Sequence, residues 1–279
     1  MEKQLRIDAH QHFWKYHPVK DVWITEEMKI IKTDFLPYDS LRELEENKMD
    51  GCIAVQASQS ESENAFLISE ADRKDFIKGV VGWVDFGSKY LPERLEFYYK
   101  FCKKMKGFRH IVQDEEDDFL LREDFCNGIR QLQQYHFTYD ILIYPKQLPA
   151  AIRFVEKFPE QKFILDHLAK PLIKEKQTEP WRTHIKEIAQ HPNVYCKLSG
   201  MVTEANWQHW EREDFFPYLD AATEAFGANR LLFGSDWPVC LVAASYQRTL
   251  NIIEAYYHHF SAEDQAAIMG GNAVKFYNL

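Results

Sequence analysis

Short apolar runs alternate with longer amphipathic stretches along the whole chain. Several runs, such as Cys52–Val55 and Phe163–Leu165, are apolar at every position, which is typical of strands covered on both faces. Their spacing of about 25 to 45 residues leaves room for a helix between successive strands. The eight predicted strands are Arg6–His12, Cys52–Ala57, Ile77–Val84, Gly107–Val112, Thr138–Tyr144, Lys162–His167, Val194–Leu198 and Leu231–Ser235.

The amphipathic stretches predict helices in the intervals between these strands. One begins at Asp39 or Ser40 and ends at Asn47, and Ser261 with Asp264 forms a capping pair for a short helix near the end. Gly270-Gly271 ends that helix, and Asn272 can cap a final one. The other predicted helices are Glu63–Lys74, Pro92–Lys104, Asp124–Tyr135, Lys146–Phe158, Trp181–Gln190 and Phe215–Phe226.

Eight strand–helix units predict an α/β protein with the (β/α)8 TIM-barrel fold rather than an open sheet. The length of 279 residues suits one barrel of this kind. The chain has no repeat, low-complexity tract or linker that would divide it. A single barrel domain over residues 1–279 is therefore expected.

Composition narrows the possible partners. The net charge of −9 argues against a nucleic-acid or anionic-membrane partner. No apolar run approaches the roughly 20 residues that a membrane span needs, and the charged segment Met1–Arg6 lacks the apolar core of a signal peptide. The five cysteines are scattered and odd in number, which favours reduced thiols. We expect a cytoplasmic protein, and leave open whether it forms a homo-oligomer.

Polar side chains gather at the carboxyl ends of the predicted strands. His10 and His12 are two residues apart, so both imidazoles face the same way. The carboxyl ends of barrel strands meet at one mouth, and burying unpaired charge is costly, so this coincidence predicts a site. The residues are His10, His12, Gln56, Arg109, His110, Asp166, His167, Lys197 and Asp236.

Two of the loops at this end are long. Phe13–Leu36 is rich in aromatic residues, including Trp14, and is a candidate lid. Gln113–Glu123 carries a run of acidic residues, for which an ordinary solvated loop is expected.

Seven stretches, in order over essentially the whole chain, resemble the amidohydrolase superfamily. Within it they are similar to the group that contains sugar-lactone hydrolases (L-fuconolactonase and L-rhamnonolactonase) and 2-pyrone-4,6-dicarboxylate lactonase. The histidine pair alone is a weak signal, whereas the seven together are strong. The stretches are Asp8–Trp14, Val81–Asp85, Gly107–His110, Leu165–Pro171, Lys197–Gly200, Phe233–Val239 and Asn272–Tyr277.

The resemblance implies a catalytic centre made of His10, His12, His167 and Asp236. In metal-using relatives, the positions of His10, His12 and Asp236 provide ligands, and zinc suits such a set. Many amidohydrolases add a late histidine and a lysine that bridges two metals. Here Lys197 stands at the late strand, and the strand Asp140–Tyr144 has no lysine. One divalent ion, with zinc favoured, or none at all is therefore expected, rather than two.

The resemblance also implies the opening of a small lactone, with the aldonolactone of a deoxy sugar such as L-fucose or L-rhamnose as the first candidate. Asp236 would activate water, and the three histidines and Lys197 would provide positive charge or hydrogen bonds to the oxyanion. Arg109 is a candidate clamp for a carboxylate or for sugar hydroxyls. The other candidates for the substrate pocket are His110, Gln56, Trp14 and Trp237.

Two other functions remain open. A metal-dependent, non-oxidative decarboxylase of the same superfamily would need a firmly held metal and a pocket for the substrate carboxylate. A non-catalytic binding barrel should have lost part of the catalytic set, and here no member is missing.

Overall fold

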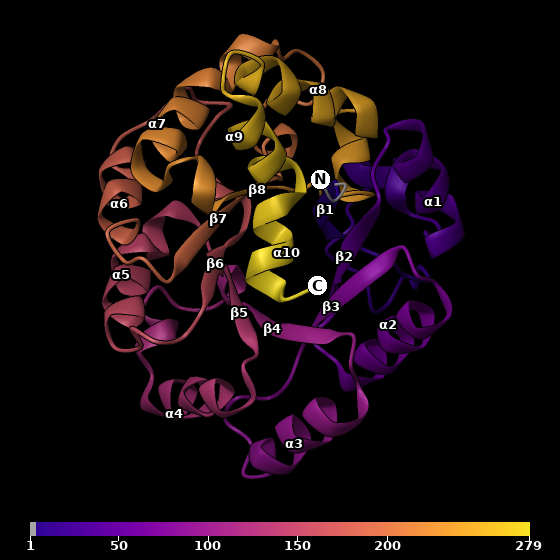
Figure 1. Cartoon of the computed structure of the whole chain (residues 1–279), viewed down its shortest axis with the longest axis vertical. Coiled ribbons are helices and arrows are strands. Elements are labelled where there is room, and N and C mark those ends of the chain that lie inside the picture. The colour runs from indigo at the N-terminus through magenta and orange to yellow at the C-terminus, as the bar shows by residue number, and fades with distance from the viewer. Residues whose placement is uncertain (1–3) are drawn as a thin grey trace.

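Eight parallel strands curl into a barrel in the computed structural model, which describes residues 4–279 (Figure 1). The strands follow each other around the barrel in chain order, which confirms the predicted TIM-barrel fold. Residues 1–3 of the expected domain lie outside the described part. The strands are β1 Ile7–Gln11, β2 Gly51–Val55, β3 Ile77–Gly82, β4 Met105–Ile111, β5 Thr138–Leu142, β6 Phe163–Leu165, β7 Val194–Leu198 and β8 Leu231–Phe233.

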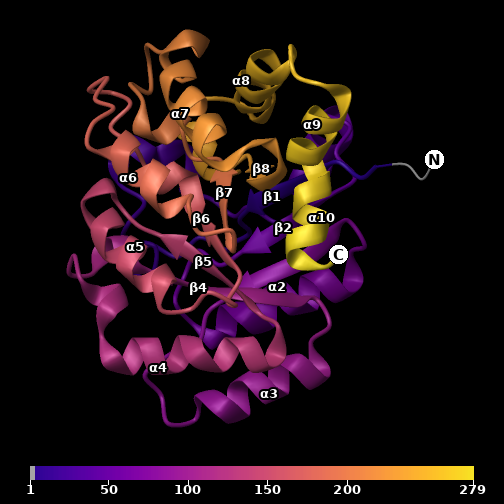
Figure 2. The same cartoon turned by 60° about the vertical axis from the view of Figure 1, so that its left-hand side comes forward.

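Most of the helices form an outer ring around the strands (Figures 1 and 2). They are α1 Pro37–Glu46, α2 Glu61–Arg73, α3 Leu91–Phe101, α4 Glu123–Leu132, α5 Leu148–Glu156, α6 Trp181–Ile188, α7 Phe216–Phe226, α8 Tyr246–Tyr257, α9 Ala262–Ala266 and α10 Asn272–Tyr277. The predicted cap of α9 is confirmed, since Ser261 Oγ accepts a hydrogen bond from the amide of Asp264.

Two details near the end of the chain differ from expectation. Helix α8 was not predicted from the sequence. Asn272 does not cap α10, because its side-chain amide donates to the carbonyls of Ala228 and Leu231 at 2.7 Å each. It therefore ties the last helix to the start of β8.

The barrel closes where β8 returns to β1. Beyond the end of β8, the amide of Asp236 donates to His10 O at 2.9 Å, and the amide of His12 donates to Trp237 O at 2.8 Å. Asp8 strengthens this seam, because Oδ1 accepts from the amide of Ser235 at 2.9 Å and Oδ2 from the hydroxyl of Tyr246 at 3.0 Å. Closure thus brings two segments more than 200 residues apart to the same point.

The interior of the barrel has two zones. Where the strands begin, it is apolar and includes Ile7, Ile53 and Ile164, with Phe276 and Tyr277 of α10 packed among them. Helix α10 lies across this end of the barrel (Figure 1). Toward the carboxyl ends of the strands, buried ionisable side chains replace the apolar ones.

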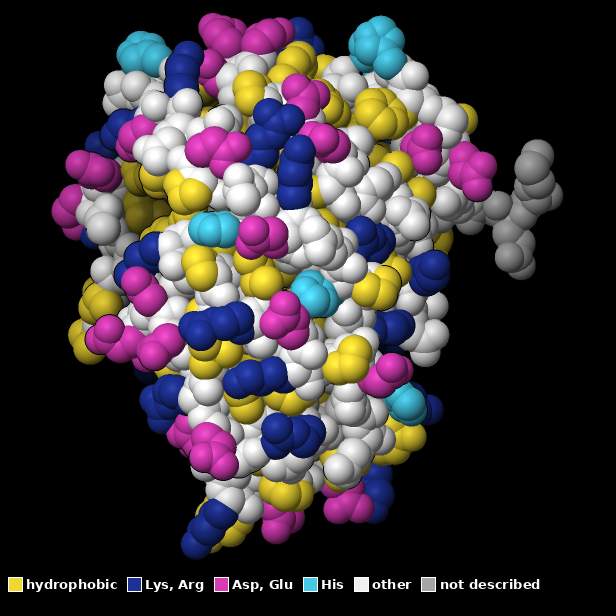
Figure 3. Space-filling view, turned by 90° about the vertical axis from the view of Figure 1, so that its left-hand side faces the viewer, with side chains coloured by type: hydrophobic (Ala, Val, Ile, Leu, Met, Phe, Trp, Pro, Cys, Tyr) yellow, Lys and Arg dark blue, Asp and Glu magenta, His cyan; other side chains and the backbone are white. Residues whose placement is uncertain are grey.

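The exterior of the molecule is mixed in charge. Figure 3 shows one face, on which Lys and Arg side chains are interspersed with Asp and Glu. All five cysteines are buried and unpaired. Within residues 4–279, no helix has both the length and the apolar character needed to cross a bilayer.

Candidate active site

Three imidazoles surround one carboxylate at the barrel seam. Asp236 Oδ1 lies 3.3 Å from His12 Nε2, 3.8 Å from His10 Nε2 and 4.0 Å from His167 Nε2. All four side chains are at most about one-twentieth exposed, with His10 fully buried. The structure therefore brings together, from β1, β6 and β8, the four residues that the sequence placed in the catalytic centre.

Two of these residues have strained backbones. His167 follows β6 with φ of 53°, and Asp236 follows β8 with φ of 57°. This left-handed conformation costs about 1–3 kcal/mol for residues other than glycine, and it persists where the surroundings enforce it, often at functional sites. Gly200 leaves room for the turn at His167, because a Cβ at Gly200 would lie 2.5 Å from His167 Nδ1.

The electrostatics favour a charged carboxylate on Asp236 and neutral imidazoles on His10 and His167. Burial opposes ionisation of Asp236, but His167, His12 and His10 outweigh it and hold the pKa of Asp236 well below its usual range. Burial lowers the pKa of His167 to about 4. Burial, reinforced by the charge of Lys197, also holds the pKa of His10 well below the usual value. At neutral pH the Asp236 carboxylate can therefore act as a base, and the neutral imidazoles have nitrogen lone pairs that can bind a metal or accept a hydrogen bond.

Hydrogen bonds fix the orientation of two imidazoles. His12 Nδ1 lies 2.8 Å from the carbonyl oxygen of Val55, which only accepts, so Nδ1 carries the proton. Nε2 of His12 therefore presents its lone pair toward Asp236. His167 Nδ1 lies 2.8 Å from Ser199 Oγ, which leaves Nε2 directed at the same carboxylate.

A second layer of buried charges lies against His10. Lys197 Nζ is 3.2 Å from His10 Nδ1, 2.9 Å from Asp166 Oδ1 and 2.5 Å from Asp140 Oδ2. Arg109 Nη1 lies 3.0 Å from Asp166 Oδ2 and 3.3 Å from His10 Nε2. The two cations and two carboxylates are at most 3% exposed. Their charges balance, as buried ionic groups require.

Two of the other predicted pocket residues, Gln56 and Trp14, lie near the cluster. Gln56 is buried beside Arg109 and donates to its carbonyl at 3.2 Å. Trp14 lies with its ring centroid 6.5 Å from that of His12, and its indole N–H donates to Thr33 O within the 13–36 loop.

His110 and Trp237 lie apart from the cluster. Neighbouring residues of a strand point to opposite faces, so Arg109 points into the barrel and His110 points outward. There His110 Nε2 lies 2.9 Å from Glu115 Oε1. The acidic loop, expected to be an ordinary solvated loop, therefore contacts the barrel through Glu115. The Trp237 ring packs against Phe35 and Phe13 and is 2% exposed. Its backbone, not its ring, contributes to the seam.

The chain from Ile7 to Leu279 matches the family model described as amidohydrolase. The protein belongs to the amidohydrolase family. It is 40% identical, over 99% of its length and 96% of the relative, to a Burkholderia multivorans protein named L-fucono-1,5-lactonase. It is 34% identical, over 98% and 96% respectively, to a Burkholderia ambifaria protein of the same name. A crystal structure of an amidohydrolase from B. multivorans with bound zinc superposes with a TM-score of 0.96, at 39% identity and 99% coverage of both chains. The resemblance drawn from the seven stretches is confirmed.

The ligand atoms of this amidohydrolase fit one metal ion. Atoms bound to zinc at about 2.1 Å in a tetrahedron lie roughly 3.4 Å apart. The Nε2 atoms of His10 and His12 are 3.1 Å apart, and Asp236 Oδ1 lies 3.8 and 3.3 Å from them, respectively. His12 also has the correct tautomer, with a backbone acceptor on its other nitrogen.

A second potential ligand group shares His10 with the first. It consists of His10, Asp166 and His167. The ammonium of Lys197 lies between two of these ligands, 3.2 Å from His10 Nδ1 and 2.9 Å from Asp166 Oδ1. A positive charge is therefore already in place on that side, and the donor set fits one ion better than two.

Sequence reasoning missed several residues that support the site. Asp140 is the one charged residue of β5, which is a usable signal once the strand is known to line the barrel. Asp8 follows the apolar start of β1, but its role at the seam depends on contacts with β8 and α8 that no local pattern reveals. Glu63 lies in the first turn of α2, where an acidic residue needs no special explanation.

Glu63 lies beside the mouth and is largely shielded from water. Its Oε1 accepts a hydrogen bond from the amide of Ala57, just after β2, at 2.7 Å. Burial raises the pKa of Glu63 to about 7, and the hydrogen bonds from the amides of Ala57 and Ser58, with the charge of Arg109, only partly offset this. Because the unfolded carboxyl titrates near 4.5, the folded state binds the proton more tightly between these two pH values.

We expect Glu63→Gln to remove a pH-dependent loss of stability. Ionisation of a group with a raised pKa lowers the free energy of unfolding as the pH rises from about 4.5 to 7. Over this pH range, the free energy of unfolding of the Gln variant should rise by roughly 2 kcal/mol relative to that of wild type. The value allows for the fact that the side chain is only partly buried. Urea unfolding of both proteins at pH 4.5 and 7.5 measures this gain. An equal difference between the proteins at both pH values would contradict it.

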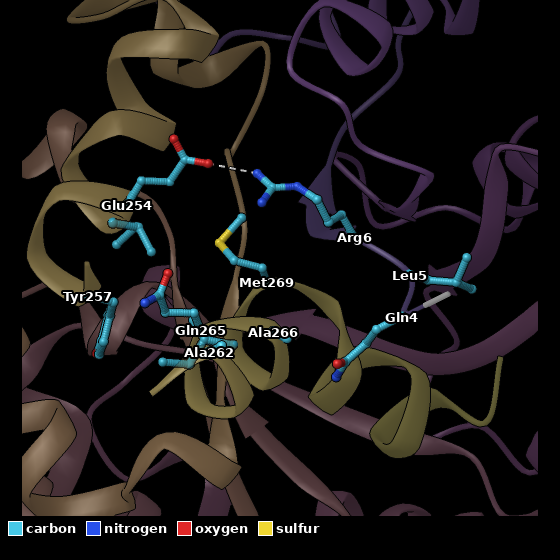
Figure 4. A pocket seen from close by; sticks show the side chains of 11 residues that line it. Gln4, Leu5, Arg6, Glu254, Tyr257, Ala262, Gln265, Ala266 and Met269 are labelled. Atoms are coloured by element: carbon cyan, nitrogen blue, oxygen red, sulfur yellow. Dashed lines mark hydrogen bonds and ion pairs between the residues drawn. The ribbon is translucent and has the colours of Figure 1, made fainter. Parts of the chain in front are cut away.

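One cavity of the amidohydrolase lies away from this site. It has a volume of about 400 Å³ and is bounded by the segment before β1 and by α8 and α9. Figure 4 shows Arg6 and Glu254 paired across it, at 2.8 Å. The cavity contains neither the histidines nor Asp236, so we assign no function to it.

Proposed function

We propose that this amidohydrolase opens the lactone ring of a deoxy-sugar aldonolactone, with L-fucono-1,5-lactone as the first candidate and an L-rhamnonolactone as the second. The observation that carries the proposal is the 40% identity to a named L-fucono-1,5-lactonase across 99% of the chain. The geometry of the Asp236 cluster is consistent with it. The whole chain, residues 1–279, would act as one hydrolase domain, and its five unpaired cysteines fit a reducing cytoplasm.

Asp236 is the group best placed to activate water. Its carboxylate is held ionised by the surrounding imidazoles, and it lies at the end of a barrel strand, where catalytic carboxylates are found. A water proton passes to Asp236 while the water oxygen attacks the lactone carbonyl carbon. The bond from that carbon to the ring oxygen then breaks, the ring oxygen takes a proton, and a hydroxy acid is released.

His10, His12 and Asp236 would hold one divalent ion, for which zinc is the best match to the donor set. When bound, zinc polarises a carbonyl oxygen and lowers the pKa of a water. His167 completes the ring around Asp236, and its Nε2 is placed to donate a hydrogen bond to the developing negative charge.

Lys197 and Arg109 take supporting roles rather than the direct contacts expected from the sequence. Lys197 is fully buried behind His10, and Arg109 is tied to Asp166 and to the carbonyl of Gln56. Both contribute fixed positive charge near the reacting centre. Contacts with the sugar hydroxyls would instead come from the mouth, including the 13–36 loop that carries Trp14.

The decarboxylase alternative is less well supported. Both full-length relatives at 34–40% identity are named as lactonases. A binding barrel without catalysis is disfavoured because Asp236 and its three imidazoles are all present and mutually oriented.

A lactone panel tests the proposed function. We expect acid release from L-fucono-1,5-lactone, followed by a pH indicator, at a rate well above the spontaneous hydrolysis measured without protein. Glucono- and galactonolactones serve as non-deoxy comparisons, and the CO₂ release from hydroxybenzoates tests the decarboxylase alternative. A folded protein that releases acid from no lactone on the panel would contradict the proposal.

A further inference from the structure

We propose that Asp140 and Tyr277 are positioning residues of the active site, which hold the ammonium group of Lys197 against His10 from inside the barrel. The last helix of the chain would thereby help to set up a catalytic centre that lies at the opposite end of the barrel. The rate measurements in the test rest on the proposed function, whereas the zinc measurement does not.

A continuous line of contacts connects α10 with the catalytic histidines. The Tyr277 hydroxyl donates to Asp140 Oδ2 at 3.1 Å, and the same oxygen accepts from Lys197 Nζ at 2.5 Å. Lys197 Nζ then reaches His10 Nδ1 at 3.2 Å. The Tyr277 ring also lies beneath the ammonium, with its centroid 5.7 Å from Nζ. All four side chains are at most 2% exposed, so water does not compete for these contacts.

Within residues 4–279, the hydrogen-bond partners of the Asp140 carboxylate are Lys197 and Tyr277. Its second oxygen, Oδ1, has no hydrogen-bond partner within residues 4–279. Burying a carboxylate is costly unless its partners compensate, and here every partner lies on Oδ2. Asp140 is thus directed at Lys197 and Tyr277, and its charge acts on the site through Lys197.

The charge balance makes Asp140 necessary for Lys197. Asp166 is shared between Lys197 and Arg109, so Asp140 supplies the second carboxylate for two buried cations. Without it, one uncompensated positive charge would remain 3.2 Å from His10, a proposed zinc ligand. The uncompensated ammonium of Lys197 would repel a metal cation. It would also be attracted toward Asp166, away from its place beside His10.

Tyr277 is expected to act only through Asp140. The hydroxyl is neutral and touches neither His10 nor Asp236, but it fixes the oxygen that Lys197 uses. Losing this one hydrogen bond leaves the charges unchanged and loosens their geometry. Two positioning residues in series should give effects that do not add.

The experiment compares Asp140→Asn, Tyr277→Phe, their double variant and the control Tyr98→Phe. Tyr98 is a matched control because its ring is also 2% exposed and its hydroxyl also donates to a carboxylate, Glu61, but it lies on α3 outside the barrel. For each protein we would measure the zinc dissociation constant by competition with a chelator, kcat and KM for L-fucono-1,5-lactone, and the midpoint of thermal unfolding.

We expect Asp140→Asn to weaken zinc binding by about 10–100-fold, as losses around metal ligands typically do, and to lower kcat by a similar factor. Tyr277→Phe should weaken zinc binding and lower kcat by roughly 3–10-fold each, with KM within about twofold. The double variant should be no more than about twofold worse than Asp140→Asn. Tyr98→Phe should lower the unfolding midpoint as Tyr277→Phe does, but leave zinc binding and kcat within about twofold.

Two results would overturn the proposal. In the first, Tyr277→Phe has the same zinc affinity and kcat as the control Tyr98→Phe. In the second, the losses of the two single variants multiply in the double variant. If Asp140→Asn does not fold, Tyr277→Phe against its control decides the question. A wild-type protein that opens no lactone contradicts the proposed function, and the zinc constants then decide this inference alone. A wild type that neither binds zinc nor opens a lactone would overturn both proposals.

Discussion

Asp236→Asn is expected to lower kcat for lactone opening by about 10²–10⁴-fold, the range typical for loss of a general base. An asparagine side chain keeps the size of aspartate, but its amide cannot take a proton from water. It also removes the charge that three imidazoles surround, and with it a proposed zinc ligand. Steady-state rates with L-fucono-1,5-lactone, corrected for spontaneous hydrolysis, measure the effect.

The control for this variant is Asp85→Asn. Asp85 also follows a barrel strand, at the same end as Asp236, but it is exposed and accepts a hydrogen bond from the amide of Gly87. It should retain wild-type kcat. If Asp236→Asn kept more than about a tenth of the wild-type rate, another group would be the base, and His167 would be the next candidate.

The fold was predictable because its signal is repeated along the chain. Each strand of a parallel barrel is covered on both faces, so a run such as Phe163–Leu165 is apolar throughout and stands out from the amphipathic helices. Helix α8 was missed because its twelve residues, Tyr246–Tyr257, follow a long loop after β8, and three tyrosines and two isoleucines obscure the helical pattern.

The site was predictable only where one strand or a family motif carries it. His10, His12, His167 and Asp236 each belong to a motif, and the structure brings them together. The roles of Arg109 and Lys197 depend on depth within the barrel, which no local pattern gives. The sequence predicted both at the mouth, and the structure places both against His10, with their charges matched by Asp166 and Asp140.

The contact between Asp140 and Tyr277 was beyond sequence reasoning altogether. The two residues are 137 positions apart and meet only because α10 lies across the end of the barrel. Tyr277 ends the family stretch Asn272–Tyr277, but nothing in that stretch indicates that its hydroxyl reaches a residue inside the barrel. The barrel fold had to be in place before this connection could be recognised.

Zinc is expected to bind at one equivalent per chain, and its removal by a chelator to lower kcat/KM by roughly 10²-fold or more, because a Lewis acid supplies several kcal/mol of charge stabilisation. Returning one equivalent should restore the rate, and a second should add nothing. The limit of one follows from Lys197, whose ammonium lies 2.9 Å from Asp166 Oδ1 and 3.2 Å from His10 Nδ1, where a second ion would need these ligands. Metal analysis of the dialysed protein, together with activity during zinc titration, measures both quantities.

His12→Ala provides the variant that tests the ligand set. Its Nε2 lies 3.1 Å from that of His10 and 3.3 Å from Asp236 Oδ1, so its loss should weaken zinc binding by at least about tenfold and leave the ion in a site of two protein ligands. His258→Ala is the control, because His258 is exposed directly after the end of α8 and contacts a backbone carbonyl of that helix. Activity that survives complete removal of the metal would show that Asp236 and the imidazoles suffice. Two tightly bound equivalents would show that Lys197 does not prevent a binuclear centre.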